Sequence, residues 1–331
     1  MNVSSFLKQL TKLRVAHVNG TPAPHKAVLL LSVIQGMEGG DIGENKIFIT
    51  PELVARFKDN WHMLVHSDQF SPNFSLPFYH LKSGGFWHLH THPGMEVLLT
   101  SSGSIKSFSG LKNAVAYACL DEGVYDLLLK RVNRELAIQT LLTTYLGGQQ
   151  LKRSGYDLFQ VYEQQILCEP PALYGTSGGC HSAGSAQIKA ALRNDASMDD
   201  EEEIFVRGGV FKKVVPRVYN YTCCISGMKI VATRDVQMID ACHIVPFSES
   251  HDDTIRNGLS LSPNFHRAFD RFLITIDRDF RVVVSPHFSE AGGHSLRAFE
   301  GKQIYLPDEV RYRPSGENLG WHYERFLRVG A

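Results

Sequence analysis

The chain has 331 residues, of which 43% are hydrophobic and 21% charged, and its formal net charge is zero. This length allows two domains that each bury a core, and the composition is that of an ordinary globular protein. No stretch is apolar for long enough to span a bilayer, and the N-terminal segment lacks the apolar region of a signal peptide. We therefore predict a cytoplasmic protein without a membrane partner. The six cysteines form no CxxC pair, so we predict neither a structural zinc site nor a disulfide framework.

The charge is unevenly distributed along the chain. Residues 1–150 hold 13 basic and 11 acidic residues (+2), residues 151–203 hold 4 and 9 (−5), and residues 204–331 hold 17 and 14 (+3). We predict one domain at 1–150, a flexible acidic linker at 151–203 and a second domain at 204–331. The acidic run Asp199–Glu203 is interpreted as a solvated spacer, with a cover over a basic DNA-binding surface as the alternative. The mildly basic flanks predict modest, salt-sensitive affinity for a polyanion.

Hydrophobic periodicity and capping residues predict a mixed helical and strand structure. In the first half we expect helices at 2–18, from His25 to the Gly39–Gly40 pair, at 52–61 after Thr50–Pro51, and at 120–146 with a break near Gly123. Strands are expected at 46–49 and as a hairpin of 77–81 with 86–89. Further along we expect helices near 155–168 and at 205–221, and a hairpin of 273–276 with 281–284.

The most informative stretch runs from Ile239 to Asp270. A short strand is expected to end at His243, a loop to carry Asn257, and a helix beginning at Pro263 to present His266 and Asp270 one turn apart. A neutral imidazole can take a proton from water near pH 7, and a divalent cation prefers imidazole and oxygen ligands. A base, an orienting amide and a metal site together suit hydrolysis of a phosphodiester.

This stretch resembles the ββα-metal motif of the HNH endonucleases in the words DACHIVPFS, NGL and SPNFHRAFD. The resemblance implies that His243 is the general base, that Asn257 orients the loop, and that His266 binds a metal ion, usually Mg²⁺ or Mn²⁺. Asp270 and Asp240 are alternative further ligands. The chain departs from the family at Cys242, where many relatives carry an Asp or His ligand, because a hard cation would not choose a thiol.

The first half resembles the sulfur-binding domain that is joined to HNH nucleases in restriction enzymes for phosphorothioate DNA. The words that carry this resemblance are APHKAVLLLSVI, TPELVARF and LPFYHLKSGGFWHL. A sulfur atom is softer than oxygen, so it requires an apolar dent beside cations, and we expect Pro77, Phe78 and Tyr79 to form that dent. The cations and further DNA contacts expected around it are His25, Lys26, His80 and Lys82. For each of these residues a purely structural role is the alternative.

The resemblances imply an α+β protein, with an N-terminal α/β DNA-binding domain and a C-terminal HNH ββα-metal domain. Its expected partner is double-stranded DNA, and double-strand cutting with one site per chain suggests a homodimer. Phosphate contacts are further expected from Lys212, Lys213, Arg217, Arg267 and Arg271. His88, His90 and His92 would share one face of a strand, which is metal-ligand spacing, but we expect a solvated or DNA-facing strand and keep a metal site as the alternative. An HNH enzyme that reads another mark or plain sequence, and a DNA-binding sensor without activity, are the alternative functions.

Overall fold

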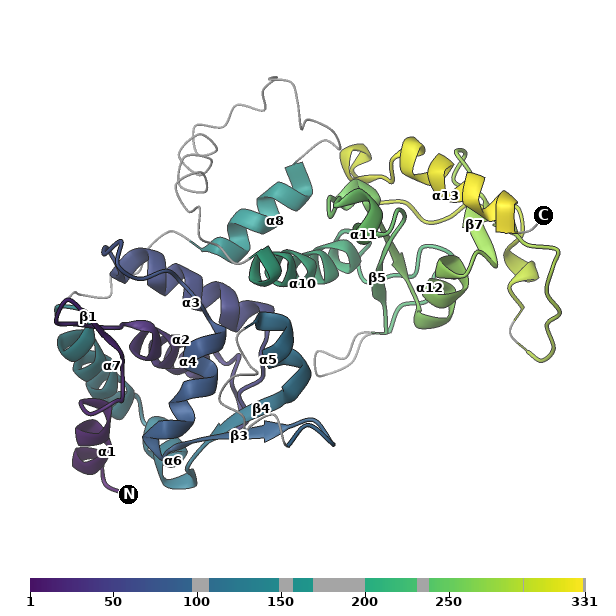
Figure 1. The fold of residues 1–331 in the computed structure, drawn as a ribbon. Helices are drawn as coiled ribbons and strands as arrows, with labels where there is room; N and C mark the ends of the chain where they lie inside the picture. The colour runs from purple at the N-terminus through teal and green to yellow at the C-terminus, as the bar shows by residue number, and fades with distance from the viewer. Residues whose placement is uncertain (97–106, 149–156, 169–199, 231–237, 294, 330–331) are drawn as a thin grey trace. The chain divides into compact units, whose positions relative to one another are not determined.

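The computed structural model describes residues 1–96, 107–148, 157–168, 200–230, 238–293 and 295–329 (Figure 1). The chain divides into two compact units. Unit 1 comprises Met1–Val161 with Ser182–Val206, and unit 2 comprises Tyr162–His181 with Arg207–Ala331. The structure therefore places a unit boundary after Val206, inside helix α10 (Asp200–Val218). Within the described residues, no helix combines the length and apolarity needed to cross a membrane.

Unit 1 is mainly helical. Its elements are α1 (Val3–Leu10), β1 (His17–Val18), β2 (Thr21–Pro22), α2 (His25–Gly39), α3 (Pro51–Leu64), α4 (Ser75–His80), the 3-10 helix η1 (Leu81–Gly84), β3 (Trp87–Thr91), α5 (Phe108–Ala114), β4 (Val115–Leu120), α6 (Glu122–Leu128) and α7 (Arg131–Tyr145). Helix α2 is the centre of this unit, because it packs against α3, α4 and α7. It is buried almost all round, as expected of a helix without a polar face.

Local signals set the ends of the central helices as predicted. Gly40 follows α2 with a φ of 84°, the left-handed conformation that ends many helices. The Thr50 hydroxyl accepts a hydrogen bond from the Leu53 amide at 3.2 Å, and Pro51 occupies the first turn of α3. The sequence predictions for these two helices are confirmed.

Other predictions for unit 1 are wrong. Residues 77–81 do not pair with 86–89, because Ser75–His80 is helix α4, and strand β3 pairs with the distant β4. The first helix ends at Leu10, and 46–49 forms only an isolated bridge of Ile47 with Ala118. The helix expected at 120–146 with a break near Gly123 is two helices, α6 and α7, which are separated after Leu128, and Leu120 belongs to strand β4.

Tertiary packing explains the helix at α4. Phe78 contacts both Phe74 and Trp87, with ring centroids 5.4 and 5.3 Å apart, and the Trp87 indole donates to the Phe78 carbonyl at 3.0 Å. The aromatic residues that raise strand propensity at this point are therefore used to fill a helical core.

The acidic run is part of unit 1 where it is described, and the solvated-spacer interpretation is wrong there. Glu202 is fully buried and forms an ion pair with Lys58 at 2.5 Å. Its other oxygen accepts from the Phe74 amide at 2.9 Å, and Glu201 accepts from the Ser109 amide at 2.8 Å. The first turn of α10 thus supplies acceptors for the N-terminal amides of α4 and α5.

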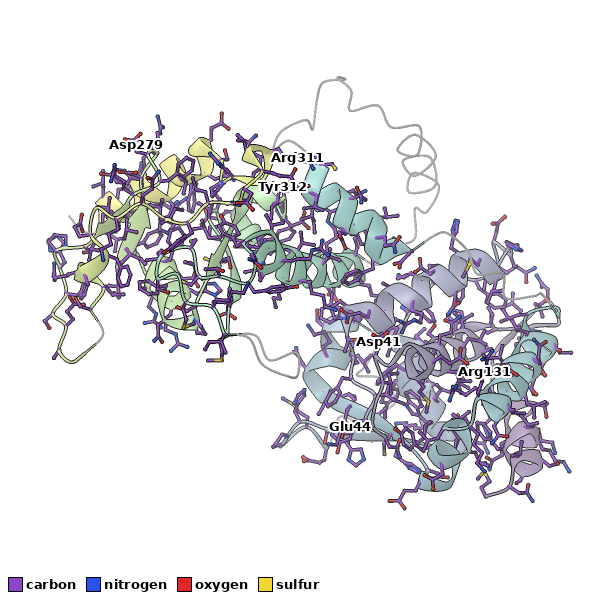
Figure 2. All side chains as sticks on the ribbon, turned by 180° about the vertical axis from the view of Figure 1, so that it is seen from behind. Asp41, Glu44, Arg131, Asp279, Arg311 and Tyr312 are labelled. Carbon is purple, nitrogen blue, oxygen red and sulfur yellow. The ribbon has the colours of Figure 1, made fainter. Side chains whose placement is uncertain are left out.

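Exposed ion pairs are also present on unit 1, for example Arg131 with Glu135 at 2.9 Å and Lys46 with Glu44 at 3.3 Å. Arg131 and Glu44 are labelled in Figure 2. Pairs of this kind contribute about 0–1 kcal/mol, because water and salt screen them. The buried Lys58–Glu202 pair differs from these, because removing one partner would leave the other charge buried without compensation.

Unit 2 contains two antiparallel hairpins and several helices. Its elements, with the two helices that begin in unit 1, are α8 (Leu158–Cys168), α10, β5 (Asp240–His243), α11 (Phe247–Ser250), η3 (Ile255–Asn257), β6 (Gly258–Leu261), α12 (Pro263–Asp270), β7 (Ile274–Ile276), β8 (Val282–Val284), η4 (Arg297–Phe299), η5 (Val310–Tyr312) and α13 (Gly316–Val329). The helices predicted near 155–168 and 205–221 and the hairpin at 273–284 are confirmed.

Strands β5 and β6 form the hairpin that carries the predicted site, and α12 contacts both strands (Figure 1). Gly258, opposite His243, lies so close to α10 that a Cβ would come within 2.7 Å of the Val215 side chain. The absence of a side chain at Gly258 therefore lets α10 approach the hairpin.

Unit 2 also contains a buried histidine away from this site. His322 of α13 lies between the Thr275 hydroxyl, at 2.8 Å from Nδ1, and the Phe269 carbonyl, at 3.2 Å from Nε2. It stacks on the Phe269 ring with centroids 3.6 Å apart. Burial lowers the pKa of His322 to about 4, so the neutral ring is the folded form.

Acid should destabilise unit 2 through His322. The unfolded ring takes a proton below its usual pKa of about 6.5, whereas the folded ring resists protonation until about pH 4. Stability from this residue is therefore complete above pH 6.5 and is lost as pH falls towards 4, by about 2–3 kcal/mol. Urea unfolding at pH 7 and pH 4.5 should show a smaller loss for His322→Gln than for the wild type. Exposed His287→Gln should keep the wild-type loss, and an equal loss in all three proteins would contradict the role of His322.

Candidate active site

Strand β5 presents different side chains on its two faces. Asp240 and Cys242 share one face, with Asp240 exposed and Cys242 fully buried, and His243 points to the other. Because α12 contacts β5, the face with Asp240 and Cys242 meets the helix that carries His266 and Asp270. Hairpin and helix together bring four possible ligands into one place.

His266 lies between the two aspartates that the sequence left as alternatives. Its Nδ1 is 3.3 Å from Asp240 Oδ2, and its Nε2 is 3.5 Å from Asp270 Oδ2. The Cys242 thiol is 3.8 Å from Asp270 Oδ1. One ligand atom each from Cys242, His266 and Asp270 lies within 4.8 Å of the others, which is close enough to hold a single metal ion.

Cys242 is the site residue that sequence reasoning discounted. The signal that could have found it is its position directly before His243, which had been set aside because a thiol is soft. Burial, and then the charge of Asp270, raises the pKa of the Cys242 thiol far above its usual range. The thiol by itself is therefore protonated at neutral pH.

His243 packs against α10. Its ring stacks on Phe211 with centroids 3.9 Å apart and an interplanar angle of 3°. Nε2 is buried and has no hydrogen-bond partner within the described ranges of the chain. Burial lowers the pKa of His243 to about 4, although the charges of Asp253 and Asp252 act in the opposite direction. The imidazole is thus neutral at pH 7, and its buried Nε2 has no hydrogen-bond partner among the described residues.

Asn257 holds the loop that follows His243. It is fully buried, and its amide bonds both backbone groups of Val245, accepting from the nitrogen at 2.9 Å and donating to the oxygen at 2.9 Å. It also donates to the Asp252 carbonyl at 2.8 Å and accepts from Asn318 at 3.1 Å. These hydrogen bonds tie the Asn257 side chain to both ends of the loop between Val245 and Asp252.

The basic residues predicted around this site lie on α10 and on or just after α12. Lys212 and Lys213 are exposed on α10, and Arg267 and Arg271 are exposed on and just after α12. Arg217 forms an ion pair with Glu163 of α8, so part of its charge is already compensated.

In unit 1, the predicted cations gather around the start of α2. Lys26 is 8% exposed, and its ammonium donates to the Arg14 carbonyl at 2.7 Å and to the Ser83 hydroxyl at 3.1 Å. Burial lowers the pKa of His80, and the charges of Lys26 and Lys82 lower it further. We call Arg14, Lys26, His80 and Lys82 the cationic cluster, because the charge of Arg14 lowers the pKa of Lys26 and the charges of Lys26 and Lys82 lower the pKa of His80.

The remaining residues predicted for unit 1 are mostly buried. Phe78 and Tyr79 are 0% and 3% exposed, and Pro77 is buried too. The prediction that these three side chains line an open dent is therefore wrong. Helix α4 instead exposes Leu76, one turn before His80. His25 stacks on Trp61 at 4.5 Å and bonds the Ser71 carbonyl at 2.9 Å, a structural role.

The histidine run on β3 does not form a metal-ligand group among the residues that the structure describes. His88 pairs with Asp121 at 2.5 Å, and His90 stacks on Tyr117 with centroids 4.5 Å apart. His92 follows the strand, where its amide bonds the Ala114 carbonyl at 3.1 Å.

The β5–β6 hairpin, its connecting segment and helix α12 carry the two histidines and the asparagine. Residues 223–277 match the family described as HNH endonuclease, and the segment is an HNH endonuclease domain. No curated protein matches the chain.

Two solved structures resemble parts of the chain. The match to a modification-dependent TagI restriction endonuclease covers 35% of this chain and 36% of that chain, at 24% identity and a TM-score of 0.26. This chain therefore spans about a third of the length of that endonuclease. The sulfur-binding domain of SprMcrA, solved with phosphorothioated DNA, matches 49% of this chain and 93% of its own, at 20% identity and a TM-score of 0.34. Neither likeness is close enough to carry an argument about what this chain binds.

Proposed function

We propose that the protein is a modification-dependent DNA endonuclease, in which unit 2 hydrolyses a phosphodiester and unit 1 binds phosphorothioate-modified DNA. The observation that carries the nuclease half is the pairing on strand β5 of a buried, neutral His243 with the neighbouring Cys242, which lies on the opposite face of the strand and meets His266 and Asp270. The phosphorothioate half is supported by the sequence resemblance of the first half and by the cationic cluster beside exposed Leu76.

The hydrolytic step begins at His243. Its free nitrogen accepts a proton from water, the water oxygen attacks phosphorus, and the bond from phosphorus to the 3′-oxygen breaks. Asn257 keeps the loop after His243 in place through both backbone groups of Val245. A divalent cation bound by His266 and Asp270 would supply positive charge to stabilise the phosphate and the departing oxygen.

The donor set fits such a cation. The exposed carboxylate of Asp270 and the Nε2 atom of His266 are 3.5 Å apart, as two ligands of one ion can be. Asp240 lies at the other ring nitrogen, where a carboxylate holds a metal-binding imidazole in one tautomer and orientation. In this assignment Asp270 is the ligand and Asp240 orients His266.

DNA recognition falls to the cationic cluster and Leu76. Among the described residues the hydrogen-bond partners of Lys26 are a carbonyl and a hydroxyl, which carry no negative charge, and Lys82 is exposed. These charges suit a phosphate, and the apolar Leu76 one turn from His80 suits a soft sulfur atom better than an oxygen. Lys212, Lys213, Arg267 and Arg271 are proposed to hold the DNA backbone in unit 2.

The sulfur preference can be measured with the full chain in a chelator, so that no cutting occurs. We expect tighter binding to a phosphorothioate duplex than to the same duplex without sulfur. Leu76→Asn should reduce that preference by roughly fivefold, since about 1 kcal/mol of apolar contact is lost. Lys82→Ala should weaken binding to both duplexes and lower the salt slope by about one.

The matched control is Lys46→Ala, because Lys46 is an exposed lysine of unit 1 that already pairs with Glu44. It should leave the sulfur preference unchanged. Equal binding of the wild type to both duplexes would reject phosphorothioate recognition and leave the nuclease with another target.

A further inference from the structure

In the HNH domain, Cys242 places a thiol at a position where a hard cation would prefer an oxygen or nitrogen ligand. Cys242 is fully buried on the face of β5 that meets α12, and its sulfur lies 3.8 Å from Asp270 Oδ1. It belongs to the same compact group of donors as His266 and Asp270. A cation placed between those two residues would therefore also meet the sulfur atom.

The two nitrogens of His266 have separate partners, and this decides which one is available. Nδ1 faces Asp240 at 3.3 Å, whereas Nε2 faces Asp270 at 3.5 Å, on the side of the donor group. A proton on Nδ1, donated to Asp240, leaves the Nε2 lone pair free for a ligand. The donor set is then one sulfur, one nitrogen and one carboxylate oxygen.

The identity of the donors constrains the cation. Mg²⁺ prefers oxygen ligands and discriminates against sulfur, while thiolate and imidazole together suit Zn²⁺ and Co²⁺. Three protein ligands also leave a coordination position open, as catalytic zinc sites do.

We propose that Cys242, His266 through Nε2, and Asp270 bind one divalent cation of borderline softness, Zn²⁺ or Co²⁺, in preference to Mg²⁺. The proposal rests on the proposed nuclease site and names its cofactor class. On binding, the Cys242 thiol loses its proton to solvent and the sulfur lone pair binds the cation, so no oxidant or reductant is involved. Asp240 remains a hydrogen-bond acceptor that orients His266.

The test is a Co²⁺ titration of the full chain followed by absorption spectroscopy, which reads the ligands directly and needs no DNA. We expect a thiolate-to-cobalt charge-transfer band in the near ultraviolet that saturates at one ion per chain, and that Zn²⁺ removes and Mg²⁺ does not. Cys242→Ser should abolish the band and weaken Co²⁺ and Zn²⁺ binding by at least about 100-fold.

Two variants keep the result interpretable. Cys224→Ser changes another buried cysteine of the same unit and should keep the band. Asp270→Asn changes an exposed ligand, so the fold should survive, and it should weaken Co²⁺ binding while the band persists at saturation. Loss of the band in Cys224→Ser, or no loss in Cys242→Ser, would overturn the assignment, as would Mg²⁺ displacing Co²⁺.

DNA cleavage assays separate this proposal from the proposed function. If the chain cuts DNA with Mg²⁺ or Mn²⁺ but shows no thiolate band, Cys242 is not a metal ligand, and the proposed nuclease function is kept. A thiolate band in a chain that cuts no DNA with any divalent ion would support the metal site and reject the nuclease.

Discussion

Replacing Glu202 by leucine is expected to lower the free energy of unfolding of unit 1 by about 3–5 kcal/mol, because it leaves a buried ammonium without its counter-charge. Lys58 is 6% exposed, and its Nζ lies 2.5 Å from the Glu202 carboxylate. The same change removes the acceptor of the Phe74 amide, so the start of α4 loses a hydrogen bond as well. Chemical denaturation of the full chain, followed by circular dichroism, measures the loss.

A double variant isolates the charge from the packing. Lys58→Met with Glu202→Leu replaces both partners with apolar side chains, and most of the lost stability should return. The exposed pair of Lys46 and Glu44 gives the matched control, where Glu44→Leu should change stability by less than about 1 kcal/mol. A Glu202→Leu effect as small as that of Glu44→Leu would show that the buried pair does not stabilise unit 1.

The second large effect is expected at His243. His243→Ala should reduce DNA cleavage by about 10²–10⁴-fold, the usual contribution of a general base, while DNA affinity stays within about twofold. The physical reason is that Nε2 of a neutral imidazole is lost, and no other described side chain bonds to that atom. Single-turnover cleavage and binding in a chelator, measured on the same duplex, separate the two quantities.

Chemical rescue distinguishes a base from a packing residue. The alanine variant leaves space beside Phe211, and free imidazole that enters it should restore part of the cleavage rate. His287→Ala removes an exposed histidine of the same unit and should cut normally. Normal cutting by His243→Ala would refute the catalytic assignment, and loss of DNA binding together with cutting would make His243 a structural residue.

Sequence reasoning did well where the signal is local. The helix that starts at Pro263 places His266 and Asp270 one turn apart because that spacing follows from helix geometry alone. The same is true of the Thr50 cap before α3 and the left-handed Gly40 after α2. At these positions the residue and its nearest neighbours in the chain are sufficient to decide the conformation.

Sequence reasoning failed where contacts with residues distant in the chain override the local conformational preference. Pro77-Phe-Tyr suggested a strand, but contacts of Phe78 with Phe74 and Trp87 favour a helix and bury the expected sulfur dent. Glu202 looked like one charge in a solvated run, and only the fold shows that it meets Lys58. The partner in each case is too distant in the sequence for any local pattern to include it.

The sequence by itself determined that residues 223–277 match the HNH endonuclease family, since the order and spacing of His243, Asn257 and His266 are properties of the chain. Only the tertiary structure decided which side chains lie together as possible metal ligands, because that depends on how α12 lies across β5. It brings Cys242 and Asp270 together and leaves Asp240 at the other nitrogen of His266. Ligand chemistry depends on distances of a few ångströms, and packing between distant segments sets those distances.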